Sequence, residues 1–471
     1  MKRLVIIGAG ISGLSLAWFL RNEDDLEVTL LEASDRVGGS IETRPHNGFL
    51  FDLGPHSLRP SRKALAILQL IMELGLDQEM LVPSMDACKK YIYRKGTLQA
   101  LPTHPLQLLR SPWRALIGSA LWRDLFCRRA LDEETIAQFA ERRFGRQLAE
   151  QFIDPLTTGI YGADFNLLSA RSCFPDWVER ERRFGPLLNS FWRRESHSHD
   201  FDPKLNALLS LPLISFQGGM ERLISSISKQ LGKRIRYGCP AQKIVGTIDG
   251  KVHVETAEGV IRADRVISTI PSYCLAKLLC DYPAVTSLLD KICYSSFTMV
   301  GLGYRGVKWQ GQGFGYLIPH EEQQSNLGVI WDSSLFPQLS PKGDCTQLTV
   351  LFGDRNLLNW HSVTEEAWVE MATEAIRKQM RWDEAPNSVV VKRVLKGIPQ
   401  YRLGHEKLIK DIETELARQL PELICLGNWR RGVSVGDCVE SSYDCAHSKI
   451  LAKFNDINDT TMKTMKIETR A

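Results

Sequence analysis

The cysteines of this sequence lack any pairing pattern. There are eleven of them, an odd number, and no two form a C-x-x-C pair. This disfavours a disulfide framework and a thiolate zinc site, so we expect reduced thiols, a reducing compartment and no bound metal.

A strong excess of charge of either sign is also missing. The chain has 59 Lys and Arg residues against 55 Asp and Glu, a net charge of +4 over 471 residues. An excess this dilute argues against nucleic acid as a partner. The apolar share of 44% and the charged share of 24% are typical of a globular protein. The length predicts two or three domains of about 100–200 residues each.

No uncharged run is longer than Leu4–Leu20, which lies near the start of the chain. It follows Lys2 and Arg3 as the core of a signal peptide would, yet it contains three glycines and no A-x-A cleavage site. It is also shorter than the about 20 residues that a membrane-spanning helix needs. We therefore interpret it as a buried strand over Leu4–Ile7 followed by a helix over Ile11–Arg21, and we expect neither secretion nor a transmembrane anchor.

A glycine-rich turn joins this strand to this helix, with the G-x-G-x-x-G sequence Gly8-Ala9-Gly10-Ile11-Ser12-Gly13. In such a turn the first glycine permits the sharp bend, the second lets the backbone approach a pyrophosphate, and the third lets the helix pack on the strand. The helix N-terminus attracts the anion. A second strand is predicted over Val28–Leu31, and Glu32 at its end is placed to accept hydrogen bonds from a ribose diol. The combination predicts a dinucleotide site.

Two further blocks follow the second strand: Asp35-Arg36-Val37-Gly38-Gly39-Ser40 and Gly48-Phe49-Leu50-Phe51-Asp52-Leu53-Gly54-Pro55. With the glycine turn and Glu32, they resemble in order and spacing the superfamily of FAD-dependent amine oxidases, phytoene desaturases and protoporphyrinogen oxidases. The resemblance implies one non-covalently bound FAD. A simple nicotinamide-dependent dehydrogenase would not be expected to carry the two extra blocks.

More blocks narrow the resemblance to the protoporphyrinogen oxidase family, and they run in family order along nearly the whole chain. They are LGP with LRP from Leu53, SARSCFP from Ser169, GFGYLIP from Gly313, PQY with GH from Pro399, and GVSV with DCVES from Gly432.

The resemblance implies an α/β fold, α+β overall, with three parts. These are a Rossmann-like FAD-binding domain assembled from discontinuous segments, an antiparallel-sheet substrate domain, and a helical membrane-associating insertion. We expect the FAD-binding segments at 1–90, 206–290 and 401–455, the helical region at 91–205, the substrate sheet at 291–400 and a polar tail at 456–471.

Periodicity and turn signals predict individual elements within these parts. A helix is expected over Ser61–Gly75 with Ser61 as its N-cap, and a hairpin over Tyr91–Tyr93 and Thr97–Leu101. Strands are expected over Arg236–Val245, Val252–Thr256, Arg265–Ile270, Phe297–Tyr304, Gly315–Pro319, Leu327–Asp332 and Gln347–Phe352.

The activity implied by the resemblance is the six-electron oxidation of protoporphyrinogen IX to protoporphyrin IX in haem biosynthesis. FAD accepts the electrons in three rounds and dioxygen takes them up as hydrogen peroxide. Because the flavin carries the redox chemistry, we expect no catalytic side chain. The cofactor-binding residues implied by the family motifs are Gly8, Ala9, Gly10, Ile11, Ser12, Gly13, Glu32, Ala33, Arg36, Gly39, Ser40, Gly54, Pro55, His56, Ser57, Ala241, Val433, Ser434 and Val435.

A bulky macrocycle needs an apolar slot, and its propionates need a cation. For the propionates, the family's arginine falls in a gapped stretch of the match, so Arg59, Arg62 and Lys63 stay as alternatives. The slot residues that the resemblance implies are Leu156, Gly159, Phe314, Leu317, Ile330 and Leu351.

The basic excess of the chain is gathered in residues 104–131, which hold five arginines and one aspartate and so carry a net +4 by themselves. The same stretch is dense in Leu, Ile, Trp and Phe. Packing against other helices and monotopic docking on an anionic membrane both explain this composition. Docking suits a hydrophobic substrate, so we expect a peripheral protein of the cytoplasm on the inner face of the cytoplasmic membrane, or on the mitochondrial inner membrane in a eukaryote. A homodimer is left open.

Three alternatives to protoporphyrinogen oxidation follow from the same resemblance. A coproporphyrinogen III oxidase of this family would act on a substrate with more propionates. Another FAD amine oxidase or desaturase is the second alternative. Rab GDP-dissociation inhibitors share the fold as lipid-binding proteins without flavin chemistry, and that alternative predicts a colourless protein.

Overall fold

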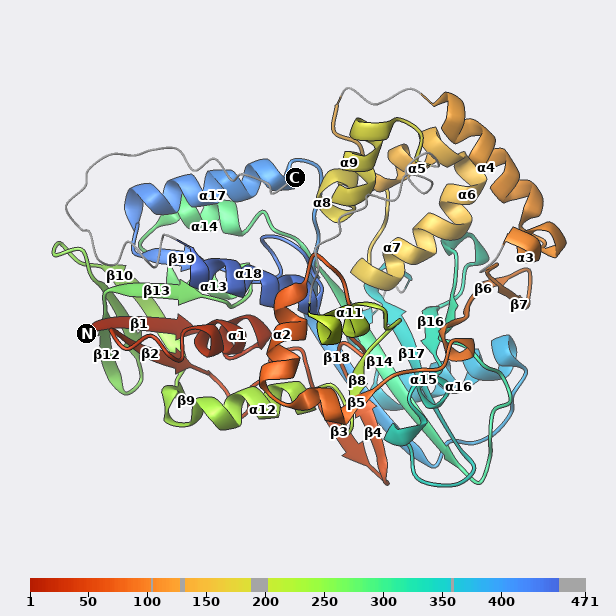
Figure 1. Ribbon diagram of the computed structural model, residues 1–471, viewed down its shortest axis with the longest axis horizontal. Helices are drawn as coiled ribbons and strands as arrows, with labels where there is room; N and C mark the ends of the chain where they lie inside the picture. The colour runs from red at the N-terminus through yellow and green to blue at the C-terminus, as the bar shows by residue number, and fades with distance from the viewer. Residues whose placement is uncertain (103–104, 128–131, 188–201, 357–359, 449–471) are drawn as a thin grey trace.

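Two sheets and a group of helices organise the chain. A computed structural model describes residues 1–102, 105–127, 132–187, 202–356 and 360–448. A parallel sheet lies at the left of Figure 1, a larger mixed sheet at the lower right, and most of the helices from residues 105–187 at the upper right.

The parallel sheet has five strands in the order β19-β13-β1-β2-β9. All four neighbouring pairs are parallel. Its strands come from the start, middle and end of the chain, so this half of the molecule is assembled from discontinuous segments. Their bounds are β1 Lys2–Ile7, β2 Leu26–Leu31, β9 Ile235–Arg236, β13 Arg265–Ser268 and β19 Leu423–Cys425.

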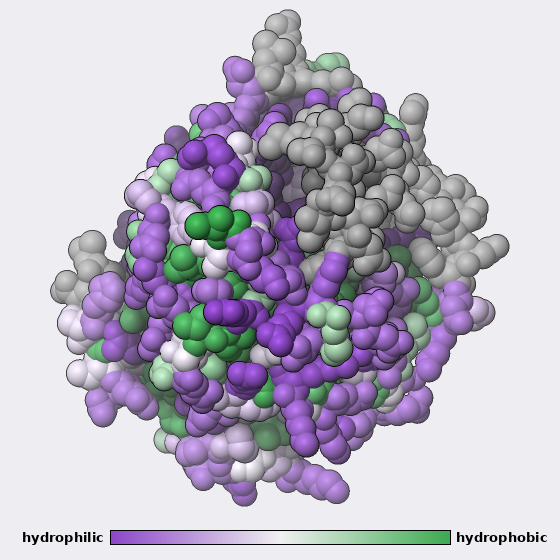
Figure 2. Space-filling model, turned by 90° about the vertical axis from the view of Figure 1, so that its left-hand side faces the viewer, coloured by the Kyte–Doolittle hydropathy of each residue, from purple (hydrophilic) through white to green (hydrophobic). Residues whose placement is uncertain are grey.

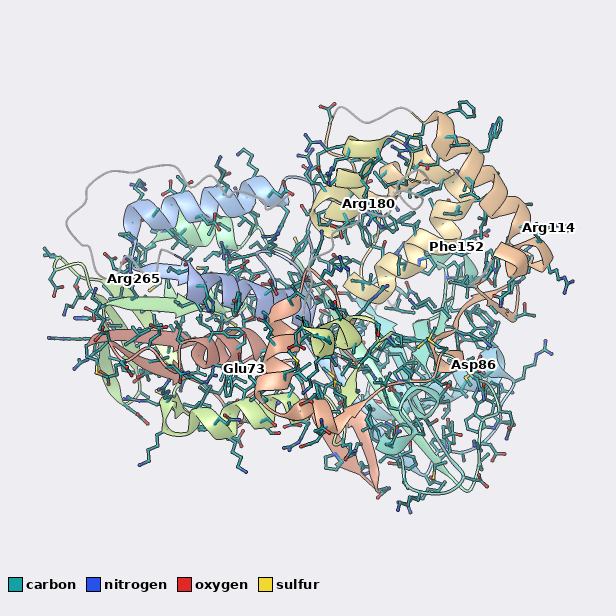
Figure 3. All side chains as sticks on the ribbon, in the orientation of Figure 1. Glu73, Asp86, Arg114, Phe152, Arg180 and Arg265 are labelled. Atoms are coloured by element: carbon teal, nitrogen blue, oxygen red, sulfur yellow. The ribbon has the colours of Figure 1, made fainter. Side chains whose placement is uncertain are left out.

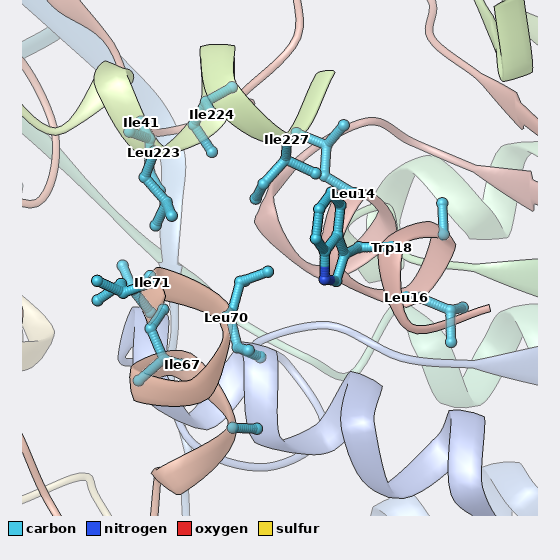
Figure 4. Packing of buried hydrophobic residues seen from close by; sticks show 14 of the residues in the cluster. Leu14, Leu16, Trp18, Ile41, Ile67, Leu70, Ile71, Leu223, Ile224 and Ile227 are labelled. Atoms are coloured by element: carbon cyan, nitrogen blue, oxygen red, sulfur yellow. The ribbon is translucent and has the colours of Figure 1, made fainter. Parts of the chain in front are cut away.

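Side chains that alternate along β1 enter two different cores. Leu4 and Ile6 pack with four helices on one face, and Figure 4 shows how Trp18, Leu70 and Ile227 meet there. Val5 and Ile7 enter the core on the opposite face, so both faces are covered, as a parallel sheet requires. The first face carries α1 Ile11–Phe19, α2 Leu65–Glu73, α12 Glu221–Leu231 and α18 Val435–His447, and the second carries α13 Ser272–Leu278, α14 Pro283–Leu289 and α17 His405–Gln419.

Short elements complete this half. A three-stranded antiparallel sheet lies at its outer edge, with β10 Ala241–Gly246, β11 Val252–Thr256 and β12 Gly259–Ala263. The remaining elements are β5 Met80–Leu81, β8 Ser215–Phe216, η1 Leu76–Glu79, η4 Gly232–Arg234 and α11 Pro203–Leu209.

Two of the predicted elements in this half are wrong in detail. The strand expected over Arg236–Val245 is two strands in different sheets, because Gly238 adopts a φ of 59° and Pro240 follows it. The helix expected from Ser61 begins only at Leu65. The Ser61 hydroxyl instead accepts the Lys63 N–H at 3.1 Å in a local turn that competes with the helix.

The second sheet has seven strands in the order β18-β14-β17-β16-β15-β6-β7. It is not wholly antiparallel as expected, because β15 pairs with β6 in parallel. This pairing brings the correctly predicted 91–101 hairpin into the sheet, and β18 was not predicted. The bounds are β6 Lys90–Arg94, β7 Thr97–Ala100, β14 Tyr294–Arg305, β15 Gly315–Leu317, β16 Asn326–Ile330, β17 Cys345–Gly353 and β18 Ser388–Pro399.

Helix α16, Glu365–Met380, packs on this sheet through a core that includes Trp360 and Trp368. A hairpin, β3 Thr43–His46 and β4 Phe49–Asp52, connects the two halves. The other short elements are α15 Asp332–Leu335, η2 Asp86–Cys88, η5 His320–Glu322, η6 Pro337–Leu339, η7 Asp354–Asn356 and η8 Trp360–Ser362.

The described part of residues 105–187 is helical, as predicted. A fully buried Arg143 holds three of its helices together, because its guanidinium pairs with Asp124 at 2.7 Å and with Glu181 at 2.5 Å. The elements are α3 Pro105–Arg110, α4 Arg114–Phe126, α5 Ile136–Phe144, α6 Arg146–Leu148, the π-helical turn η3 Ala149–Ile153, α7 Asp154–Tyr161, α8 Ala170–Cys173 and α9 Pro175–Phe184. The expected polar tail, residues 456–471, lies outside the described residues.

Candidate active site

A cavity of about 530 Å³ lies where the parallel-sheet half, helix α7 and the seven-stranded sheet meet. The segments that follow β2 and β4 supply one wall, α7 a second, and strands β14, β16, β17 and β18 a third. The residues around it are Arg36, Gly39, Ser40, Leu53, Gly54, Pro55, His56, Thr158, Gly159, Ile160, Gly162, Phe297, Met299, Leu327, Ile330, Leu351, Phe352, Lys392, Arg393, Val394, Leu395, Gly397, Ile398, Asn428 and Val433. Most of these side chains are apolar.

The predicted glycine turn lies between β1 and α1. A Cβ on Gly13 would come within 1.9 Å of the Gly8 carbonyl oxygen, so only glycine lets the helix pack this closely on the strand. At Gly10, by contrast, a Cβ would meet nothing within 4 Å, and this N-cap residue offers no side-chain acceptor to the first turn. The N–H groups at the start of α1 therefore have no side-chain cap, and the space beside Gly10 is open, as an anion site at a helix N-terminus requires.

The predicted acid Glu32 is held against this turn. One carboxylate oxygen accepts the Ala9 N–H at 2.9 Å, and the other accepts the Ser34 N–H at 3.0 Å. The Arg36 guanidinium closes the next loop, since it donates to the Gly39 carbonyl at 2.6 Å. The loop and the β1–α1 turn approach each other at the bridge between Gly10 and Gly38.

The predicted cofactor residues fall into two groups. Arg36, Gly39, Ser40, Gly54, Pro55, His56 and Val433 line the cavity. The others surround the glycine turn or lie further along the same half: Ala33 follows Glu32, Ser57 follows His56, Ala241 begins β10, and Ser434 caps α18 one residue before Val435.

The predicted slot residues are brought together only in part. Gly159, Ile330 and Leu351 line the cavity. Among the described residues, its wall does not include Leu156, Phe314 or Leu317. Leu317 nevertheless packs close to α7 at Gly159, because a Cβ on Gly159 would lie 3.0 Å from the Leu317 Cδ2 atom.

The predicted basic residues lie apart from this wall. Lys63 forms an ion pair with Asp176 of α9. Arg59 and Arg62 are exposed. Burial lowers the pKa of Lys90, and the nearby charge of Arg59 lowers it further. The turn at Ser61, which replaces the expected first helical turn, directs this segment toward the surface.

Lys392 of β18 is a cavity cation that the sequence did not single out. Its Nζ pairs with the Glu42 carboxylate at 2.8 Å, and both side chains are 17% exposed. Burial alone would raise the pKa of Glu42, yet hydrogen bonds from Lys392 and Arg44 lower it to about 2. The Glu42 carboxylate is therefore ionised at neutral pH, whereas burial lowers the pKa of Lys392 against the opposing effect of Glu42. The pair connects the glycine-rich segment to the seven-stranded sheet.

A second missed feature is a buried group of polar residues at the cavity around His56. The His56 Nδ1 lies 2.7 Å from Asp332 Oδ1, and the Thr349 hydroxyl donates to Asp332 Oδ2 at 2.7 Å. Burial lowers the pKa of His56, but the Asp332 and Asp52 carboxylates outweigh burial and leave it raised. No local pattern reveals this group, because His56 and Asp332 are 276 residues apart.

Across the residues that the structure describes, no group of His, Cys, Asp and Glu is arranged to hold a metal ion. What the site offers is an uncapped helix N-terminus, a large apolar cavity beside it, and a few buried polar groups at the cavity wall. This arrangement suits an extended cofactor that enters the cavity with its reactive end and a bulky apolar substrate that lies against it.

Comparison with known proteins agrees with this geometry. Residues 11–448 match the family described as flavin containing amine oxidoreductase. The chain is 32% identical to the protoporphyrinogen oxidase of Bos taurus, over 94% of this chain and 98% of that protein, and 32% identical to that of Homo sapiens, over 95% and 98%. It is 27% identical to the coproporphyrinogen III oxidase of Bacillus subtilis (strain 168), over 93% and 96%.

Solved structures share the fold. A protein from Exiguobacterium sp. 255-15, provisionally described as a protoporphyrinogen oxidase, superposes with a TM-score of 0.81 at 25% identity over 96% of this chain and 99% of that chain. Reduced UDP-galactopyranose mutase superposes with a TM-score of 0.71 at 19% identity over 96% and 94%, which shows the fold alone.

Proposed function

This chain belongs to the flavin containing amine oxidoreductases and, among them, to the protoporphyrinogen oxidases, and from that membership we propose that it oxidises protoporphyrinogen IX to protoporphyrin IX in haem biosynthesis. FAD is its cofactor, and it is an oxidoreductase. Dioxygen serves as the final electron acceptor and is reduced to hydrogen peroxide.

The observation that carries this proposal is the apolar cavity beside the glycine turn. A cavity of about 530 Å³ falls within the range of about 300–1,000 Å³ typical of small-molecule sites. Its apolar wall suits a tetrapyrrole, and Gly159 lets α7 lie close to Leu317, since a Cβ there would come within 3.0 Å of Leu317 Cδ2.

The residues present fit FAD. The open space at Gly10 and the uncapped start of α1 accommodate the diphosphate, Glu32 lies at the end of β2 beside Ala9, and Gly39, Ser40 and Gly54 lead to the cavity. When bound, the isoalloxazine ring supplies the hydride acceptor. The protein's own task is to bind and orient both molecules and to keep bulk water away.

Turnover of two porphyrinogens tests the substrate. The FAD-loaded chain, given protoporphyrinogen IX or coproporphyrinogen III in air, should form the fluorescent porphyrin faster from protoporphyrinogen IX, with three hydrogen peroxide molecules per porphyrin. A preference for coproporphyrinogen III would show that the chain is a coproporphyrinogen III oxidase, the activity for which the Bacillus subtilis relative is named.

KM values for Arg59→Ala, Arg62→Ala and Lys63→Ala test which cation binds the propionates, and unchanged values in all three would remove that hypothesis.

The same proposal includes docking on a membrane through α4. Trp122 and Phe126 are 66% and 70% exposed, and Leu121 and Leu125 lie exposed beside them. On the other side of the helix, Trp113 is buried against the Phe152 ring at 4.5 Å. Figure 3 shows Phe152 inside the helical region and Arg114 at its outer edge. An exposed apolar face next to arginine is the composition that binds an anionic interface.

The end of the molecule seen in Figure 2 is mostly hydrophilic, with only scattered apolar side chains. In the described ranges, no helix is both long enough and apolar enough to cross a bilayer. Arg128 and Arg129 of the predicted basic segment lie outside the described residues. Flotation with vesicles containing anionic lipid tests the docking, and equal flotation after serine replaces Trp122 and Phe126 would contradict it.

A further inference from the structure

His56 lines the cavity, and one of its ring nitrogens is buried without a hydrogen-bond partner among the described residues. Its side chain is 9% exposed, and among the described residues its Nε2 has no hydrogen-bond partner although it is shielded from solvent. Buried polar atoms in proteins are normally paired, so an orphan at a cavity wall points to a ligand that completes it.

The opposite edge of the same ring is fixed. Asp332 at the start of α15 holds Nδ1 at 2.7 Å, and the Thr349 hydroxyl on β17 holds the second Asp332 oxygen at 2.7 Å. A carboxylate at Nδ1 makes Nδ1 the protonated nitrogen of neutral imidazole, so the lone pair lies on Nε2. The carboxylate also stabilises the imidazolium that forms when Nε2 takes a proton.

The surroundings favour proton uptake at this ring. Asp332 and Asp52, at the end of β4, are the titratable groups that face it. Asp52 accepts hydrogen bonds from the Thr43 hydroxyl at 2.5 Å and from the Met220 N–H at 3.0 Å. Burial raises the pKa of Asp52 to about 6 against the opposing effect of His56, so near neutral pH two carboxylates surround one imidazole.

We propose that His56 is a catalytic residue that accepts, at Nε2, the proton which each oxidation step must remove from the porphyrinogen. The inference rests on the proposed function. It replaces the expectation that no side chain takes part, and it assigns Asp332 and Thr349 as positioning residues that hold the ring.

The balance of each two-electron step requires such a group. One C–H bond at a meso carbon breaks and its hydride leaves to the flavin. One N–H bond of a pyrrole, or a C–H bond of another meso carbon, breaks and its proton leaves to His56 Nε2, while a carbon–nitrogen or carbon–carbon double bond forms. Once flavin and substrate fill this mostly apolar cavity, the proton needs an acceptor on the wall, and His56 lines that wall with an Nε2 that lacks a partner among the described residues.

Single-turnover reduction tests the proposal. FAD-loaded chain is mixed with protoporphyrinogen IX without oxygen, and loss of the oxidised flavin absorbance is followed against pH. Wild-type reduction should slow as the pH falls through the pKa of His56. His56→Asn keeps a donor toward Asp332 but removes Nε2, so reduction should slow about 10²- to 10⁴-fold and lose this pH dependence. His46→Asn is the matched control, since His46 Nδ1 likewise has a side-chain partner, the Ser388 hydroxyl at 2.9 Å, but His46 lies outside the cavity wall.

Two further measurements keep the proposal testable if His56→Asn folds poorly. Asp332→Asn removes the carboxylate that raises the pKa of His56. The pH range over which flavin reduction slows in acid, the acid limb of the rate profile, should therefore move to lower pH. Imidazole nitrogen shifts of His56, followed by NMR in the FAD-loaded chain, should titrate at the midpoint of that limb, which separates His56 from Asp52. Added imidazole should restore reduction in His56→Ala.

Several outcomes would overturn it. They are unchanged reduction with an unchanged acid limb in His56→Asn, a limb that stays in place in Asp332→Asn, or a His56 titration that does not coincide with the limb. Failure of the proposed function looks different, because wild-type flavin would then not be reduced by protoporphyrinogen IX at any pH.

Discussion

The two sides of the cavity are built in different ways. The cofactor side is made by short segments, in which Gly13 packs on Gly8 and Arg36 binds the Gly39 carbonyl a few residues away. The substrate side is made by contacts between distant segments, such as Gly159 against Leu317 and His56 against Asp332. The cofactor side can therefore be disrupted by one local change, whereas changes on the substrate side should alter turnover and leave the flavin in place.

Gly13→Ala should have the largest effect. Its Cβ would lie 1.9 Å from the Gly8 carbonyl oxygen, so α1 must move away from β1 and the anion site is lost. We expect the purified variant to contain no FAD by absorption spectroscopy and to be inactive. Gly118→Ala is the matched control, because nothing lies within 4 Å of that Cβ position in α4. Normal flavin content in Gly13→Ala would contradict the claim that one local change disrupts the cofactor side.

Gly159→Val should act on the substrate side alone. The new Cβ would lie 3.0 Å from Leu317 Cδ2, so α7 must shift against β15 and the cavity wall must change shape. We therefore expect kcat/KM for protoporphyrinogen IX to fall about 10- to 200-fold, the range expected when a pocket misfits its substrate by a methylene or so. Steady-state kinetics measures the loss, and flavin content should stay that of the wild type. Gly118→Val is the control. A parallel loss of FAD would mean that the two sides are not independent.

The Glu42–Lys392 pair joins the two sides, and its removal should affect stability. Glu42→Gln leaves a mostly buried ammonium without its partner, and we expect a loss of about 1–3 kcal/mol in the free energy of unfolding at neutral pH. The pKa of Glu42 is about 2 in the folded chain against an ordinary 4.5, so its contribution is complete above pH 4.5 and lost as the pH falls toward 2. Denaturant unfolding at several pH values should show the wild-type and variant curves converge in acid. The double variant Glu42→Gln, Lys392→Met should recover part of the loss, and no recovery would contradict the pairing.

The smallest effect is expected on α4, which belongs to neither side. Trp122→Ser or Phe126→Ser should each weaken vesicle binding about 5-fold, since partial burial of one large apolar side chain contributes about 1 kcal/mol. Activity in detergent should not change. Ile248→Ser is the control, an exposed apolar residue in the turn between β10 and β11. Equal weakening by Ile248→Ser would remove α4 as the docking face.

The difference between the two sides also explains what could be predicted from the sequence. The β1–α1 turn and Glu32 lie where expected, because glycine requirements and strand periodicity are local properties. The residue ranges of most strands in the second sheet were predicted, although β18 was missed. The parallel pairing of β15 with β6 could not be predicted, because no local sequence pattern indicates it.

The substrate side depended on tertiary structure. Leu156, Phe314 and Leu317 were predicted to line the slot but are not part of the cavity wall, because whether a side chain enters the cavity depends on how α7 packs against the sheet. The helix start at Leu65 depends on a side-chain bond of Ser61 that periodicity does not reveal. His56 was predicted near the cofactor by motif, while its partner Asp332 could be found only in the folded chain.

The central claim is that a porphyrinogen reaches the flavin in this cavity and reduces it. The most direct measurement is the visible absorbance of the FAD-loaded chain on mixing with protoporphyrinogen IX without oxygen, followed by admission of air. Our account predicts loss of the oxidised flavin bands, formation of porphyrin and return of the bands in air. An oxidised flavin spectrum that persists while protoporphyrinogen IX remains unconsumed would contradict it.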